Sequence, residues 1–183
     1  MAWVNELNLT AKKFVCGHCS QNVASNRGWH SGGNSSIIIY LCPLCDKPNY
    51  FEASIQIPGP TPGNEVASLP TDVEALYREA RRSVSIAAYT ASVLISRKLL
   101  GHIAVQKGAA AGKTFVEYVE HLASSGYVPP DGKGWVDHIR KKGNEATHEI
   151  VLMQHGDADE LLLFLEMLLR FVYEFPARVP LVP

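Results

Sequence analysis

Four cysteines stand in two close pairs, and their type and spacing predict a metal site. Cys16 and Cys19 form one C-x-x-C motif, and Cys42 and Cys45 form a second, with 22 residues between the pairs. Each motif bends the backbone so that two sulfurs converge, and two motifs together provide the tetrahedral thiolate shell that Zn²⁺ favours. We therefore expect a structural Zn²⁺ bound by all four cysteines, with no coordination position left for water.

Two other interpretations of the cysteines are disulfide bonds and a redox C-x-x-C motif. A redox motif opens a helix after a strand in a βαβ unit, and one copy would suffice. The first residues lack the basic stretch and long apolar core of a signal peptide, which indicates a cytoplasmic protein whose thiols stay free for metal. His18 and His30 are alternative ligands, but four thiolates already complete the shell, so we expect both histidines at the surface.

The overall composition limits the class of protein. The chain has 183 residues, 46% of them hydrophobic, which is enough for one sizeable core and a small second domain. Lys and Arg number 17 against 18 Asp and Glu, so the basic excess of a bulk electrostatic nucleic-acid binder is absent. No apolar run reaches the roughly 20 residues of a membrane span. We expect a soluble protein with no membrane partner.

The cysteine motifs lie among short segments with strand character. Residues 13–15 lead into the first motif, the β-branched run 36–41 leads into the second, and residues 50–57 alternate apolar with polar side chains. The segment 20–34 is rich in Ser, Asn and Gly, which predicts an exposed loop. Strand, motif, strand, motif, strand is the order of a zinc ribbon, which we assign to residues 1–57.

The sequence changes character after this ribbon. Residues 58–68 are rich in Pro and Gly and predict a linker. Thr71, with a Glu three residues later, predicts a capping box and a helix start. From residue 73 to 103 apolar residues recur at helical spacing, which indicates one long helix or two joined by a subtle kink. Further helices are expected over residues 114–123, 134–142 and 161–175, with Pro176 ending the last.

Four segments of the helical part resemble a known family. They are Leu69–Val73, Tyr77–Ala80, Arg97–Leu100 and Ile139–His148. Together they are similar to the bacterial domain of unknown function 4145, which is commonly grouped with the HEPN superfamily (higher eukaryotes and prokaryotes nucleotide-binding) and often follows a zinc ribbon. The resemblance implies a mainly α fold: a HEPN-like helical bundle over residues 69–183, preceded by the small β zinc ribbon.

The resemblance also implies a chemistry. Active members of the superfamily cleave RNA without metal, using an Arg followed after four to six residues by a His at a dimer cleft. In this sequence Arg140 precedes His148 by eight positions, Lys142 is in better register, and Gly101 stands where the family usually has Glu. His148 would transfer a proton, Arg140 would stabilise the phosphorane, and Asn144 would hold a phosphate oxygen.

Two functions remain open from the sequence. One is a metal-independent endoribonuclease that uses Arg140, Asn144 and His148. In the other, Asn144 caps a helix and Arg140–Lys142 complement the helix dipole. The protein is then a zinc-binding module that binds and regulates a nucleic acid or a protein, in phage defence; neutral charge and the long Arg-to-His spacing favour this function. The helix over 161–175 is apolar on more than one face, so we also expect a homodimer.

Overall fold

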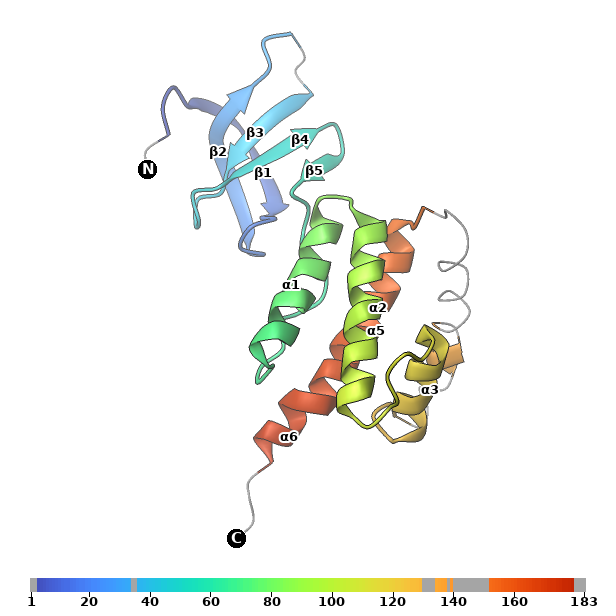
Figure 1. Ribbon diagram of the computed structural model, residues 1–183. Coiled ribbons are helices and arrows are strands. Elements are labelled where there is room, and N and C mark those ends of the chain that lie inside the picture. Colours follow the sequence, from blue (N-terminus) through green and yellow to red (C-terminus); the bar gives the residue numbers. More distant parts are fainter. Residues whose placement is uncertain (1–2, 34–35, 130–133, 138, 140–151, 180–183) are drawn as a thin grey trace. The chain divides into compact units, whose positions relative to one another are not determined.

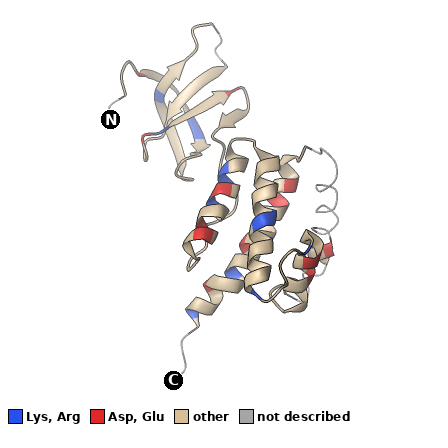
Figure 2. Cartoon of the chain, in the orientation of Figure 1, with Lys and Arg blue, Asp and Glu red and all other residues tan. Residues whose placement is uncertain are grey.

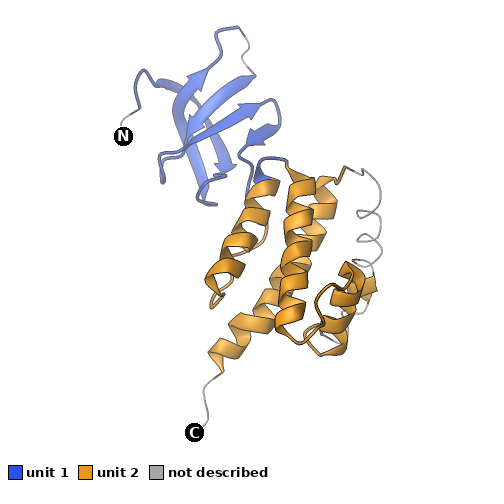
Figure 3. Ribbon diagram, viewed as in Figure 1, with its two compact units in different colours: residues 1–61, 85–87 blue, residues 62–84, 88–183 orange. Residues whose placement is uncertain are grey.

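The computed structural model describes residues 3–33, 36–129, 134–137, 139 and 152–179. The chain forms two compact units, which Figure 3 distinguishes by colour. The first comprises Met1–Thr61 with Ser85–Ala87 and contains the strands, and the second comprises Pro62–Val84 with Ala88–Pro183 and contains the helices (Figure 1). Each unit has its own hydrophobic core.

The first unit is a five-stranded antiparallel sheet in which neighbouring strands follow one another along the chain. Its strands are β1 (Leu7–Val15), β2 (Asn22–His30), β3 (Ile37–Leu41), β4 (Pro48–Glu52) and β5 (Ile55–Ile57). In such a meander every second turn lies at the same end of the sheet, because successive strands run in opposite directions. The β1–β2 and β3–β4 turns, which carry the two cysteine motifs, therefore share one end.

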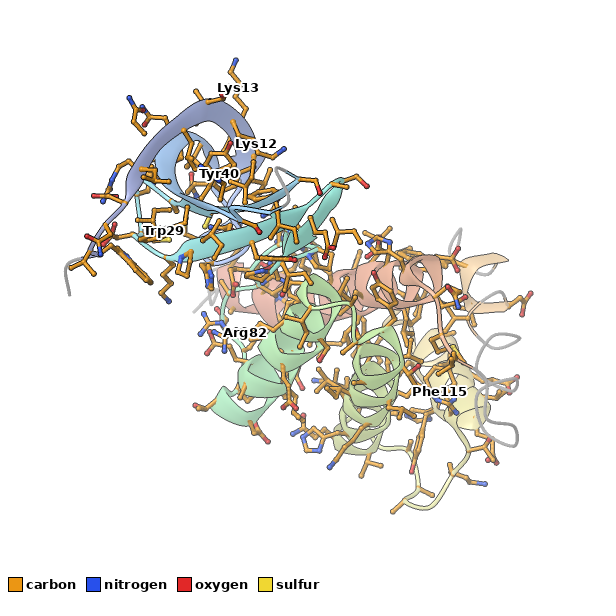
Figure 4. The ribbon with its side chains drawn as sticks, turned by 90° about the horizontal axis from the view of Figure 1, so that it is seen from above. Lys12, Lys13, Trp29, Tyr40, Arg82 and Phe115 are labelled. Carbon is orange, nitrogen blue, oxygen red and sulfur yellow. The ribbon has the colours of Figure 1, made fainter. Side chains whose placement is uncertain are left out.

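Alternate side chains of each strand belong to opposite faces of this sheet. One face forms the core of the unit around three packed aromatic rings, those of Phe14, Tyr40 and Phe51. The other face carries a row of residues paired directly across four strands, Trp29, Ile39, Tyr50 and Ile57. Figure 4 labels one member of each face, Tyr40 and Trp29. The second face is thus also apolar and aromatic.

The prediction of an exposed loop over residues 20–34 is wrong, because most of that segment forms β2. Val23 and Ser25 occupy two of its inward positions. Because Ser25 is polar although it is buried, the sequence lacks the alternation of apolar and polar residues that is typical of a strand. At Gly28 a Cβ atom would lie 1.8 Å from the carbonyl oxygen of Ile39 on β3. The glycine that predicted a loop is therefore required for strand pairing.

The prediction of a mainly α fold, a HEPN-like bundle with a small β appendage, is also wrong. The chain forms a five-stranded sheet followed by helices, so the fold class must include a sheet unit as well as a helical unit. The sequence predicted only three strands. It missed β2, and the single strand predicted over residues 50–57 is in fact β4 and β5, which are separated by a turn where Ala53 has a φ of 52°.

The second unit packs its helices around a central helix. The elements are α1 (Thr71–Ser85), α2 (Tyr89–Gln106), α3 (Phe115–Ser124), α5 (His155–Leu169), the π-helical turn η2 (Arg170–Glu174) and α6 (Phe175–Arg178). Most residues of α5 are buried, and α2 packs against both α5 and α3. None of the described helices combines the length and apolar character that a membrane crossing requires.

Several helix boundaries differ from the sequence prediction. A break at Ala87, which has a φ of 60°, separates α1 from α2, so the interpretation as one long helix is wrong. Thr114 and Glu117 form a capping box that begins α3 at the predicted place. The last helical stretch begins at His155, earlier than predicted, and it continues past Pro176, which lies in the first turn of α6 where no backbone N–H is needed.

Residues 62–68, which we call the strap, are held on the helical unit by charged side chains. Arg81 donates hydrogen bonds to two strap carbonyl oxygens, at 2.7 and 3.0 Å. Glu166 accepts hydrogen bonds from the backbone N–H and the side-chain amide of Asn64, at 2.9 and 3.1 Å. Arg81 also pairs with Glu65. Because Arg81 and Glu166 are buried, these contacts leave no charge of either side chain without a partner.

The carboxyl groups of this network are more acidic than usual. Burial alone would raise the pKa of Glu166, but hydrogen bonds from Asn64 and Arg170 outweigh it and hold that pKa below its ordinary value. Burial likewise opposes ionisation of Glu65, and hydrogen bonds from Arg81 lower its pKa nonetheless. Both carboxyls therefore stabilise the strap in their ionised form.

Candidate metal centre

The two cysteine motifs form matching turns at the shared end of the sheet. In the first, the N–H of Cys16 donates to the carbonyl oxygen of Gln21 at 3.0 Å, and the N–H of Ser20 donates to that of Cys16 at 2.8 Å. The second repeats both bonds, at 3.0 Å from Cys42 and 2.9 Å from Asp46. Ser20 and Asp46 occupy the same position and have φ values of 56° and 55°. Equal sequence spacing therefore gives equal backbone geometry.

The four sulfurs converge between these turns. Sγ of Cys16 lies 3.7 Å from Sγ of Cys45, and Sγ of Cys19 lies 3.7 Å from Sγ of Cys42. All four ligand atoms lie within 4.8 Å of one another. A tetrahedral ion with metal–sulfur bonds of about 2.3 Å separates its sulfurs by about 3.8 Å, whereas a disulfide needs about 2.05 Å. The spacing thus fits four ligands of one metal ion, and the cysteines are unbonded to one another.

The redox interpretation of the motifs also lacks its structural context. Cys16 and Cys42 each follow a strand, but the next element is an antiparallel strand and no helix starts at either motif. A redox C-x-x-C motif places its first cysteine at a helix N-terminus, which lowers its pKa. The turns in this sheet instead aim the sulfurs at a common centre.

The buried side chain of Asn49 on β4 supports the first cysteine turn. Its Nδ2 donates toward Sγ of Cys16 at 3.5 Å, and its Oδ1 accepts from the backbone N–H of Gly17 at 3.0 Å. Nδ2 also donates to the carbonyl oxygen of Lys47 in the second turn, at 3.2 Å. Asn49 is completely buried and links both turns. Asn49 was not among the residues predicted from the sequence, although a polar residue at an inward strand position soon after the last cysteine is a usable signal.

The thiols differ in acidity. Burial raises the pKa of Cys45 to about 12. Burial also opposes ionisation of Cys16, but N–H donors from the backbone of His18 and Cys19 and from Asn49 outweigh it and lower the pKa of Cys16 to about 7. Without a cation, therefore, the four thiols of Cys16, Cys19, Cys42 and Cys45, which we call the cysteine quartet or sulfur quartet, do not all ionise near neutral pH. A divalent metal supplies the positive charge that stabilises four neighbouring thiolates.

Gly17 is required by the close packing of the chain behind the first motif. A Cβ atom at this position would lie 2.1 Å from the carbonyl oxygen of Pro58. Gln56 on β5 fixes the same region, because its Nε2 donates to the carbonyl oxygens of Val15 and Pro58 at 2.7 and 3.1 Å. The last strand of the sheet therefore braces the first cysteine turn.

Neither histidine near the motifs is directed at the sulfurs. The ring Nε2 of His18 lies 2.9 Å from the carbonyl oxygen of Pro48, and His18 is exposed. His30 is exposed at the far end of β2, where its Nδ1 lies 3.2 Å from the carbonyl oxygen of Ser31. The prediction that both lie at the surface is confirmed. Four cysteines make up the cluster among the described residues.

The sequence-predicted catalytic residues Arg140, Asn144 and His148 lie outside the described residues. The basic cluster Arg140–Lys142 lies there as well. The nearest described residue before them is Ile139, which is buried in the core of the helical unit. Their predicted roles stay predictions.

Comparison with known proteins gives one match. The family described as "Domain of unknown function (DUF4145)" matches residues 78–180, which is more than half of the chain. No curated protein and no solved structure matches the sequence. The predicted resemblance to this family is confirmed over residues 78–180, which leave out the segment Leu69–Val73, whereas the HEPN grouping and the zinc ribbon remain predictions.

Proposed function

This chain belongs to the DUF4145 family, and from that premise we propose that it is a zinc-dependent binding module that recognises and regulates a nucleic acid or a protein partner. The observation that carries the proposal is the sulfur quartet, with its two 3.7 Å contacts and matching turns. In this proposal residues 1–57 form a zinc ribbon, residues 58–68 join it to the rest, and residues 69–183 form the family domain.

The metal in this proposal is Zn²⁺, bound by Cys16, Cys19, Cys42 and Cys45. Four soft thiolate ligands in a tetrahedral arrangement select Zn²⁺ or an iron–sulfur centre, and the close sulfur spacing leaves room for one ion. Four thiolates fill the coordination shell, so the ion holds no water and performs no hydrolysis. Its role is to stabilise the sheet unit, which has a small core of its own. The free thiols fit the reducing cytoplasm.

The second face of the sheet supports a binding role. Ile57 is 42% exposed and Ile55 is 58% exposed, and the ring of Trp3 packs at a tilt against that of Trp29, with centroids 5.5 Å apart, at the edge of the same face. Exposed aromatic and aliphatic side chains on a rigid sheet are typical of a recognition surface. A metal that fixes the strands would also fix this surface.

A homodimer is part of the proposal. Along α5, η2 and α6, the side chains of Leu163, Phe171 and Phe175 are 58%, 41% and 42% exposed. Phe171 and Phe175 contact one another, with ring centroids 5.2 Å apart. An apolar stripe of this kind on a buried helix supports self-association. The resemblance to the HEPN superfamily supports the dimer and a role in phage defence.

Metal content tests the proposal. The purified protein should retain one zinc per chain, and Cys42→Ser should lose it together with the β-sheet signal in circular dichroism. Lys47→Ala, an exposed change in the same turn, is the matched control and should retain zinc. Wild-type protein without metal, folded equally well before and after treatment with a chelator, would contradict the proposal.

The alternative function is a metal-independent endoribonuclease that uses Arg140, Asn144 and His148. The sequence supports it, because a basic residue, an amide and a histidine follow one another at four-residue intervals. The test is incubation of the purified protein with assorted RNAs beside the variant His148→Ala. Cleavage that disappears in the variant supports the enzyme, and intact RNA with both proteins supports the binding module.

A further inference from the structure

A surface groove in the helical unit lies between α2 and α3. It has a volume of about 430 Å³ and is lined by Arg97, Lys98, Gly101, His102, Val105, Phe115 and Tyr118. Figure 4 labels Phe115 between the ribbons of these two helices. All charged or titratable groups on the α2 side of the groove are basic, because α2 contains no Asp or Glu. Figure 2 shows blue for Lys and Arg on α2.

Two acidic residues beside this groove, Asp72 and Glu117, already have partners. Asp72 lies 3.7 Å from Nε2 of His102. Glu117 accepts from the N–H of Thr114 in the α3 capping box and from Lys113 at 3.0 Å. These carboxylates lower the local positive charge without filling the groove, since neither is a lining residue. Lys98 is exposed within it.

Apolar side chains flank the cationic centre on the same helix face. Leu94, Lys98 and Val105 are spaced by four and seven residues, so they follow one stripe of α2. Leu94 is 54% exposed and Val105 is 40% exposed. Gly101 lies on the same stripe, and the ring of Tyr118 fills the space of its missing side chain, because a Cβ there would lie 3.3 Å from that ring. The stripe is therefore apolar at both ends and cationic in the middle.

The groove favours an acidic peptide over a nucleic acid. One face of the Phe115 ring is covered by the guanidinium of Arg97 at 4.7 Å, and the Tyr118 ring lies against Gly101, so neither ring is a bare platform for a base. A nucleic acid also needs several phosphate contacts, whereas Arg97, Lys98 and His102 are the basic residues that line the groove among those the structure describes. A peptide that presents one or two carboxylates needs no more basic residues than these.

We infer that the groove between α2 and α3 binds an acidic amphipathic segment of a partner protein, with a carboxylate at Lys98 and apolar side chains against Leu94 and Val105. The groove and such a segment are complementary in charge, and two exposed apolar side chains of α2 can contact the apolar face of the segment. This inference deepens the proposed binding function by naming a partner class and a site in the helical unit.

The test uses a labelled amphipathic peptide of leucine and glutamate, about four helical turns long, and a matched peptide with glutamine in place of glutamate. Fluorescence anisotropy with the full-length protein should show binding of the first peptide and at least about tenfold weaker binding of the second. Lys98→Glu should weaken the acidic peptide about tenfold, and Val105→Asp should also weaken it. Lys13→Glu, an exposed strand residue with the same charge change, should stay within about twofold.

Three results would overturn the inference. They are no binding of the acidic peptide, equal binding by wild type and Lys98→Glu, and binding of a single-stranded RNA that Lys98→Glu abolishes while the peptide does not bind. The zinc content of each variant is measured in the same samples. Absence of zinc from the wild-type protein would count against the proposed metal site. Failed peptide binding by wild-type protein that contains zinc counts against the groove alone.

Discussion

Asn49→Ala is the substitution that most directly probes how the sheet positions its sulfurs. Asn49 is fully buried, donates to Sγ of Cys16 and accepts from the N–H of Gly17. Truncation leaves that partly buried N–H without its side-chain acceptor, which costs about 1–3 kcal/mol, and removes one donor that favours the Cys16 thiolate. Partners that orient metal ligands are typically worth 10–100-fold in metal affinity. We therefore expect Asn49→Ala to bind zinc about 10–100-fold more weakly than wild type.

The assay for Asn49→Ala is competition for zinc against a chromophoric chelator, with circular dichroism to confirm that the helices remain folded. Asn26→Ala is the matched control, because Asn26 is an exposed asparagine on β2 whose side chain bonds only to Asn8 at 2.8 Å among the contacts of the described residues. Asn49→Asp retains an acceptor for the Gly17 N–H but places a carboxylate beside the thiolates, so it should weaken zinc binding as well. An Asn49→Ala affinity within about twofold of wild type would refute the role given to this residue.

Three further predictions concern packing and charge. Gly17→Ala places a Cβ against the Pro58 carbonyl and should destabilise the sheet unit by about 1–3 kcal/mol in urea unfolding; unchanged stability would show that the loop moves freely. Glu166→Gln breaks a buried charge network and should lower the stability of the helical unit by about 1–3 kcal/mol, while an unchanged urea midpoint would contradict the strap contacts. The pKa values of Glu65 and Glu166 are lowered by folding, so their stabilisation is present above the unfolded value of about 4.3 and is lost as pH falls through the lower folded values. The helical unit should lose stability below about pH 4, and a pH profile of Glu166→Gln with the wild-type slope would refute this assignment.

The cysteine quartet was accessible from the sequence because its information is local. A C-x-x-C spacing fixes the geometry of one turn, and the two turns then need only a meander to bring them to one end of the sheet. The family resemblance was accessible for a similar reason, since it rests on short segments read along the chain.

The sheet itself was less accessible because its strands depend on distant partners. In β2 the buried Ser25 and the close approach of Gly28 to Ile39 make sense only once β3 is paired beside it. Glycine is depleted in strands, and a polar serine at an inward position breaks the apolar alternation, so tertiary pairing overrides local propensity in this segment. That segment is the main reason the fold class was wrong.

The supporting polar contacts were hidden for the same physical reason. Asn49 contacts Gly17 and Cys16 across more than thirty residues, and Glu166 contacts Asn64 across 102. A sequence shows that such side chains are polar but not that they are buried. The strap was predicted as part of a linker because Pro and Gly dominate its composition, while its partners Arg81 and Glu166 lie on helices.

X-ray absorption at the zinc edge, together with metal analysis of the purified full-length chain, is the decisive measurement for the cysteine quartet. One zinc per chain with four sulfur neighbours at about 2.3 Å is the result expected from the positions of Cys16, Cys19, Cys42 and Cys45. A chain free of metal, or a zinc ion with nitrogen or oxygen in place of any sulfur, would contradict it.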